Sequence, residues 1–158
     1  MKRILKLSIV LLGALFVLLG CRSESKASFV FQTANAEVTF TYVYDKGNDT
    51  VLSLTTKSVM KLANIPEYDT ITRRIRDELV NEMKDIEGIK VTTSDSEKEL
   101  NFTIEVDVNK FKFDDAASRK KAPTLYNTVN AALKRKDNMV SYQLSKDAIL
   151  EYDFKEVK

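Results

Sequence analysis

Residues 37–60 read EVTFTYVYDKGNDTVLSLTTKSVM, and this stretch decides the fold. Its first half alternates polar and apolar residues with the two-residue period of a half-buried β-strand. The apolar set is Val38, Phe40, Tyr42 and Tyr44. Residues 45–49 then supply Gly and Asn, which tolerate the positive φ of a tight connection. Because residues 50–60 are rich in β-branched side chains, the whole stretch predicts a hairpin with a loop of about five residues.

The segment downstream of the hairpin predicts a long amphipathic helix. Its apolar residues recur at spacings of three and four: Ile71, Ile75, Leu79, Met83 and Ile86. Pro66 opens the segment, and Asp69 or Thr70 can cap its first amide groups. Gly88 is suited to the position just past its C-terminal end. We expect a helix from about Asp69 to Glu87 that packs its apolar side on one face of the sheet.

A second alternating run predicts a further strand. Its apolar members all fall on one face: Leu100, Phe102, Ile104, Val106 and Val108. The phase slips after Asn109, because Phe111 and Phe113 occupy odd positions, so a bulge or the strand's end is expected at Asn109–Lys110. A shorter strand is predicted over residues 89–92.

The last third of the chain predicts shorter elements. A second amphipathic segment begins at Pro123, and the cations of residues 134–136 suit its C-terminal end. Ser145 is a good cap for a last helix from roughly Lys146 to Asp153. The predicted fold is therefore α+β: an antiparallel sheet, built from the hairpin and the long alternating strand, packed against one long amphipathic helix, with one or two short helices towards the C-terminus.

Residues 1–21, MKRILKLSIVLLGALFVLLGC, predict an export signal. Three cations precede an uncharged run of about fourteen residues, which is short for a bilayer span of about 20. The final Leu-Leu-Gly-Cys resembles the lipobox of bacterial lipoproteins, in which a diacylglyceride is attached to the cysteine before cleavage ahead of it. We expect residues 1–20 to be removed, residues 21–28 to form a lipidated Cys21 and a polar tether, and residues 29–158 to form a single domain.

Composition narrows the possible functions. The chain has 25 basic and 23 acidic residues, and loss of the three cations of the signal leaves 22 basic residues against 23 acidic ones. A near-neutral surface argues against a nucleic-acid partner, whose binding relies on positive charge. There is no histidine and no cysteine apart from Cys21. This removes the usual zinc ligands and the Cys–His and Ser–His–Asp catalytic arrangements, and we expect no cofactor.

The order of these segments resembles the YehR-like bacterial lipoproteins. The resemblance rests on the lipobox, VTFTYVY followed by VLSLTTKSVMKL, a long helix closing in EGIKV, the strand LNFTIEVDV and a terminal LSKDAIL helix that runs into an aromatic residue. It spans nearly the whole chain. It implies a compact α+β domain held at the cell envelope, and it implies no known activity.

Two groups of residues are candidates for a site. Asp107, Asp114 and Asp115 could hold a divalent cation or act as acid–base groups, although acids at a strand end are usually solvated. Five tyrosines could line a carbohydrate or peptide groove, or simply border the core: Tyr42, Tyr44, Tyr68, Tyr126 and Tyr142.

The sequence predicts a non-catalytic binding module that is held on the cell membrane or outer membrane by the lipid on Cys21. Its partner would be a protein or a small molecule of unspecified chemistry. Two alternatives stay open: an envelope hydrolase or transferase that uses carboxylates, and a structural or assembly factor of the envelope.

Overall fold

A computed structural model describes residues 23–157. Its strands form one antiparallel sheet in the order β4-β5-β3-β2-β1-β8. The strands on this path are β1 (Glu24–Gln32), β2 (Ala36–Asp45), β3 (Thr50–Lys61), β4 (Ile89–Asp95), β5 (Glu99–Asp107) and β8 (Lys155–Val157). Two further strands, β6 (Lys134–Lys136) and β7 (Met139–Ser141), pair with each other, and β7 joins β3 through Ser141 and Thr50. The α+β class with an antiparallel sheet is confirmed.

The predicted hairpin is confirmed as β2 and β3. The register pairs Phe40 with Thr56 and Tyr42 with Leu54, with an irregularity between Val43 and Tyr44. In the connecting turn Asp49 adopts a positive φ of 52°. The Asp49 carboxylate accepts hydrogen bonds from the hydroxyl of Ser141 and the amide of Gln143, so this turn also holds the start of the last helix.

The sheet begins earlier than expected. Strand β1 starts at Glu24 and pairs with β2 along its whole length, so residues 24–28 of the predicted tether belong to the sheet, and the tether prediction was wrong there. These residues carry mostly polar side chains because β1 lies towards the edge of the sheet. At the other break in pattern, β5 ends at Asp107, two residues before the bulge or strand end that was predicted at Asn109–Lys110.

The longest helix within residues 23–157, α2 (Pro66–Met83), begins and ends earlier than predicted. Pro66 occupies its first turn, and its N-cap is Ile65, without a side-chain cap. Gly88 lies beyond the helix and has a φ of 81°. A Cβ at Gly88 would stand 2.5 Å from the backbone nitrogen of Phe111, so this glycine serves a close backbone approach and does not cap the helix.

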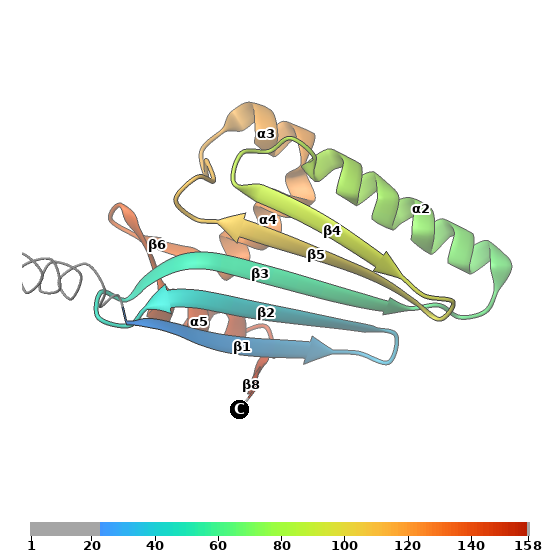
Figure 1. Ribbon diagram of the computed structural model, residues 1–158, viewed down its shortest axis with the longest axis horizontal. Helices are drawn as coiled ribbons and strands as arrows, with labels where there is room; N and C mark the ends of the chain where they lie inside the picture. Colours follow the sequence, from blue (N-terminus) through green and yellow to red (C-terminus); the bar gives the residue numbers. More distant parts are fainter. Residues whose placement is uncertain (1–22, 158) are drawn as a thin grey trace, which may run out of the picture.

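Most of the helical cover of the sheet comes from α4 (Pro123–Ala132) and α5 (Tyr142–Leu150), behind the sheet in Figure 1. The long helix α2, which was predicted to pack on this face, contributes less of the cover than these two shorter helices. Only the C-terminal end of α2 reaches the core, through Met83, with Leu79 packed against it. The largest fully buried side chains come from the sheet and from α4 and α5: Tyr42, Tyr126, Phe29, Leu54, Leu100, Leu125, Ile149, Val51, Val106 and Val129.

The chain between β5 and the C-terminus differs from prediction in its helix ends. Helix α3 (Ala116–Lys121) was not predicted, and Asp115 caps it. The cations of residues 134–136 form β6 instead of ending a helix. Helix α5 is capped by Ser141, whereas Ser145 is fully buried, donating to the Ser141 carbonyl and accepting from the amide of Lys134.

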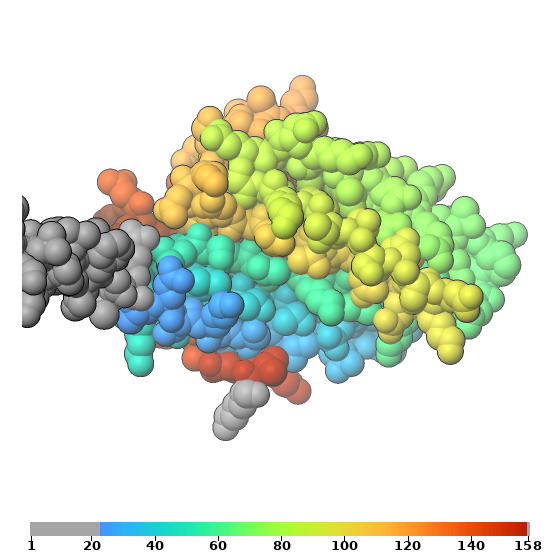
Figure 2. Space-filling model, viewed as in Figure 1, coloured from blue at the N-terminus to red at the C-terminus, as the bar shows by residue number. Residues whose placement is uncertain are grey.

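No element within residues 23–157 covers the opposite face of the sheet, which is mainly polar. Figure 2 shows strands β1 to β5 exposed together across this face. Its side chains alternate with the core residues and include Thr39, Thr41, Thr55, Lys57, Thr103 and Glu105. Among the helices that the structure describes, none has the length and apolarity that a bilayer crossing requires.

Candidate functional site: an aromatic pocket between the sheet and two helices

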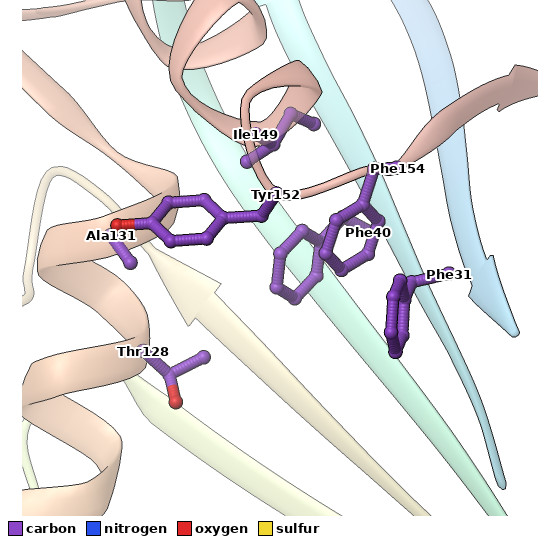
Figure 3. Close-up of a pocket in the computed structure, with 7 residues that line it drawn as sticks. All are labelled: Phe31, Phe40, Thr128, Ala131, Ile149, Tyr152 and Phe154. Atoms are coloured by element: carbon purple, nitrogen blue, oxygen red, sulfur yellow. The ribbon is translucent and has the colours of Figure 1, made fainter. Parts of the chain in front are cut away.

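An apolar pocket of about 320 Å³ opens between the sheet, α4 and the chain that follows α5 (Figure 3). Its lining residues are Phe31, Phe40, Thr128, Ala131, Ile149, Tyr152 and Phe154. Four of the seven carry aromatic rings. Pockets that bind small molecules have volumes of about 300–1,000 Å³ and mainly hydrophobic and aromatic walls, so this hollow lies at the lower end of that range.

The floor of the pocket follows from strand alternation. Phe29 pairs with Phe40 and Phe31 with Val38, which places Phe31 and Phe40 on the helix-bearing face of the sheet. Phe154 stacks on Phe40 with ring centroids 4.7 Å apart and planes 8° apart. The Phe31 ring lies 5.6 Å from that of Phe154. These three rings form a continuous aromatic surface on one side of the pocket.

The other side is built by α4 and the end of α5. Thr128 and Ala131 lie on α4 at helical spacing, and Figure 3 shows the Tyr152 ring extended towards Ala131. Tyr152 is 58% exposed, so its ring stands at the mouth of the pocket. Asp153, with a φ of 62°, turns the chain between Tyr152 and Phe154. The segment after α5 thus contributes two of the four rings.

The side chains that line the pocket are uncharged. None of its lining residues carries a carboxylate, an amine or a thiol, and its polar side-chain atoms are the hydroxyls of Thr128 and Tyr152. General acid–base catalysis needs a titrating group within hydrogen-bond reach of the substrate, which this lining does not offer near neutral pH. The arrangement is suited to holding an apolar group against aromatic faces.

Each of the three candidate acids is hydrogen-bonded to different partners. Asp107 binds the Lys110 ammonium at 3.0 Å and the amide of Asn109. Asp114 forms a two-bond pair with the guanidinium of Arg135. These interactions lower the pKa of both carboxyls, with the hydrogen bonds from Lys110 and Arg135 as the largest causes.

Asp115 has a structural role as well. Its carboxylate accepts hydrogen bonds from the hydroxyl and amide of Ser118 and from the amide of Ala117, which lowers its pKa and starts α3. Within residues 23–157 no three acidic, histidine or cysteine side chains are grouped as metal ligands. The structure therefore does not bring Asp107, Asp114 and Asp115 together in one site.

Four of the five candidate tyrosines belong to or border the core. The Tyr42 hydroxyl donates to the carbonyl of Ala132 at 2.8 Å, and that of Tyr126 donates to the carbonyl of Lys112. Tyr44 stacks on Tyr142 with centroids 3.6 Å apart. Burial is the largest cause of the raised pKa of Tyr42, Tyr126 and Tyr142. Tyr42, Tyr44 and Tyr142 hold α4 and α5 on the sheet, and Tyr126 ties α4 to the segment before α3. None of the four lines the aromatic pocket.

Tyr68 lies apart from the other four, on α2, with 49% of its surface exposed. Cys21 and the predicted signal lie outside the described residues. The pocket itself was missed by sequence reasoning, because Phe31 and Phe40 are about 110 to 120 residues away from Tyr152 and Phe154 along the chain. The alternation of β2 identifies Phe40 as an inward residue, but no local pattern connects it with the C-terminal aromatic residues.

Neither a protein-family model nor a curated protein matches the sequence. Two solved structures resemble the fold. The NMR structure of the Escherichia coli YehR protein is 19% identical, with a TM-score of 0.64, over 85% of this chain and 91% of that chain. The NMR structure of a protein from Streptococcus pneumoniae TIGR4 is 15% identical, with a TM-score of 0.55, over 85% of each chain. The chain therefore has a YehR-like α+β fold.

Proposed function

We propose that the protein is a lipid-anchored binding module of the cell envelope, and that the aromatic pocket is its binding site. The observation that supports binding is the pocket itself, with its four rings and uncharged lining. An engineered apolar cavity of about 150 Å³ is large enough to bind benzene. A pocket of about 320 Å³ therefore has room for an apolar group of roughly two rings.

The chemistry of the lining favours an uncharged or apolar ligand group. A sugar or a charged metabolite needs convergent hydrogen-bond partners, and burying an unpaired polar group is costly. Thr128 and Tyr152 supply only two hydroxyls. The ligand thus enters with its apolar part and leaves any polar part at the open mouth.

The anchor is supported by the sequence of residues 1–21. A basic start, an apolar run and a terminal Cys21 are the parts of a lipoprotein signal. Strand β1 begins at Glu24, three residues after Cys21. Because an extended residue spans at most about 3.6 Å, the sheet would begin within about 11 Å of the lipidated cysteine. The domain would then work close to the lipid surface.

A fluorescent probe tests the pocket. We expect the protein beginning at residue 22 to bind the uncharged probe N-phenyl-1-naphthylamine and to enhance its fluorescence. Ala131→Leu fills the pocket and should weaken binding at least tenfold, with its thermal midpoint close to that of the parent. Asn130→Leu, at the neighbouring exposed position of α4, is the matched control. Unchanged probe affinity in Ala131→Leu would refute the pocket as the site.

Processing tests the anchor. Cys21→Ser should abolish incorporation of labelled palmitate, leave the precursor uncleaved and change its membrane fractionation. Ser23→Ala, two residues further on, should be processed like the parent chain. Labelled, normally processed Cys21→Ser protein would contradict the lipid anchor while leaving the pocket proposal intact.

A further inference from the structure

Four large apolar residues at the N-terminal end of α2 stand exposed: Ile65, Tyr68, Ile71 and Ile75, with exposed fractions of 57%, 49%, 47% and 49%. We call them the α2 patch. Exposed apolar side chains that adjoin one another on a helix mark interaction surfaces more often than scattered ones do. We propose that the α2 patch docks a cationic amphipathic helix of a partner polypeptide.

The patch continues the core-facing side of α2 beyond the point where the core ends. Ile71 and Ile75 precede Leu79 and Met83 at spacings of four residues, so the four side chains follow one another along the helix. Met83 is buried and Leu79 packs against the core. In Figure 1 the N-terminal half of α2 extends past α4 and α5 towards the β4–β5 turn. The described chain thus supplies no helix to cover this half.

Ion pairs hold α2 in this position. The guanidinium of Arg76, itself buried, binds both carboxylate oxygens of Asp95 at 2.5 and 2.9 Å. Arg76 also binds Asp77, and Arg73 lies 3.4 Å from Asp95. Because Asp95 ends β4, these pairs fasten the helix to the edge strand. The patch is therefore presented by a fixed helix.

The excess of acidic residues on α2 favours a cationic partner. Helix α2 carries five acidic and three basic residues. Two of the three arginines are engaged with Asp95, and Arg74 lies 3.8 Å from Glu78. Glu67 and Glu82 add negative charge on the same helix. A second copy of α2 or an anionic lipid surface would bring like charges together, whereas lysines or arginines beside an apolar stripe would complement the patch.

The length of the patch fits a helical partner. Ile65 and Ile75 are ten residues apart, which is about 15 Å along a helix. An amphipathic helix that offers apolar side chains at positions i, i+3 or i+4, and i+7 covers such a length with about three turns. This surface is distinct from the aromatic pocket, and its occupation does not require a ligand there.

A pair of designed peptides tests the inference. The probes are two 14-residue helical peptides with the same leucine positions, one filled with lysine and the other with glutamate, each carrying fluorescein. We expect fluorescence anisotropy to show at least tenfold tighter binding of the lysine peptide to the protein beginning at residue 22. The double variant Ile71→Ser, Ile75→Ser should lose at least tenfold in affinity for it.

Matched variants keep the test specific. Leu144→Ser with Leu150→Ser removes two apolar residues of α5 that are 43% and 41% exposed, and should leave peptide binding unchanged. Glu78→Gln with Glu82→Gln should weaken binding of the lysine peptide and reduce its salt dependence. The double variant Ile71→Ser, Ile75→Ser should still bind N-phenyl-1-naphthylamine, and this result would show that the α2 patch and the pocket are separate sites. Equal binding of both peptides, or full affinity in the serine pair, would overturn the inference.

Discussion

Helices α2 and α4 show how differently two amphipathic helices can be used. Helix α2 has 18 residues, and its buried residues are Arg76 and Met83. Helix α4 has 10 residues and buries Leu125, Tyr126, Val129 and Ala132. The longer apolar stripe thus contributes less to the core. Periodicity identifies which side of a helix is suited to burial, but the position of the helix over the sheet decides how much of it is buried.

Chain connectivity explains the difference. Helix α2 joins the end of β3 to β4, which is the edge strand of the sheet, so it lies along that edge. Helix α4 is fastened over the centre of the sheet, where the Tyr42 hydroxyl of β2 reaches the carbonyl of Ala132. A helix at an edge has sheet under only part of its surface. A helix over central strands is covered along its length.

The comparison of α2 with α4 predicts the largest difference in the free energy of unfolding when a large aliphatic residue on each helix is replaced by alanine. Leu125 of α4 is 1% exposed, and Leu125→Ala should cost about 2–5 kcal/mol because it removes buried methyl groups and leaves a cavity. Urea denaturation followed by circular dichroism measures the loss. The matched change on α2 is Ile71→Ala, at a residue that is 47% exposed. Equal losses in the two variants would show that α2 is as central to the core as α4.

The second prediction concerns the hydrogen bond that ties α4 to the sheet. Tyr42→Phe keeps the fully buried ring and removes the hydroxyl that donates to the Ala132 carbonyl at 2.8 Å. The carbonyl loses its side-chain partner, and we expect a loss of about 1–3 kcal/mol in the free energy of unfolding. Tyr152→Phe, at the exposed mouth of the pocket, is the control and should be near neutral. A neutral Tyr42→Phe would mean that packing alone positions α4.

The sheet was easier to predict than the helical layer for a physical reason. In β2 and β5 apolar and polar residues alternate over a few neighbouring positions, as at Val38, Phe40 and Tyr42. The local sequence is therefore enough to predict which side chains face the core. Strand β1 was placed too late because residues 24–28 carry serine and lysine and gain their order from pairing with β2. The partners of residues 24–28 in β2 lie 13 to 21 residues away along the chain.

The pocket was not predictable for a related reason. Tyr152 and Phe154 follow α5 and belong to no periodic segment, and the pocket arises only when Phe154 stacks on Phe40. The possible acidic site at Asp107, Asp114 and Asp115 did not form, for the opposite reason: here residues close in sequence have separate roles. Asp114 and Asp115 are adjacent in sequence, yet one pairs with Arg135 and the other caps α3. Adjacency in sequence therefore did not produce a shared site.

The third prediction concerns the ion pairs that hold α2 at the edge. Arg76→Met should lower the free energy of unfolding by about 1–2 kcal/mol, a modest loss because the Asp95 side chain is 35% exposed and partly screened. Lys90→Met, on the strand that carries Asp95 and in an exposed pair with Glu105, is the control and should change little. Urea denaturation at pH 7 compares them. Equal losses would mean that the Arg76 pair acts as an ordinary surface pair.

The ion pair between Arg76 and Asp95 should also make the free energy of unfolding depend on pH in the acid range. The hydrogen bond from Arg76 is the largest cause of the lowered pKa of Asp95. A carboxyl whose pKa is lower in the folded state stabilises the protein above its unfolded pKa of about 3.9, and the contribution is lost as pH falls through the folded value. We therefore expect the parent protein to lose more stability between pH 5 and pH 3 than Asp95→Asn. Parallel losses would show that other carboxyls dominate this range.

The smallest effect is expected at the α2 patch, and it is the sharpest test of the contrast between the two helices. Ile75→Ala removes a side chain that is already 49% exposed, so the loss of stability should be below about 1 kcal/mol. Val129→Ala on α4, where the side chain is 1% exposed, should cost more even though it removes fewer carbon atoms. If Ile75→Ala proves the more damaging change in urea denaturation, the exposed half of α2 contributes to the core, and its apolar residues are retained for stability. If it is nearly neutral, stability does not account for this stripe, and an interaction with a partner becomes the physical reason for it.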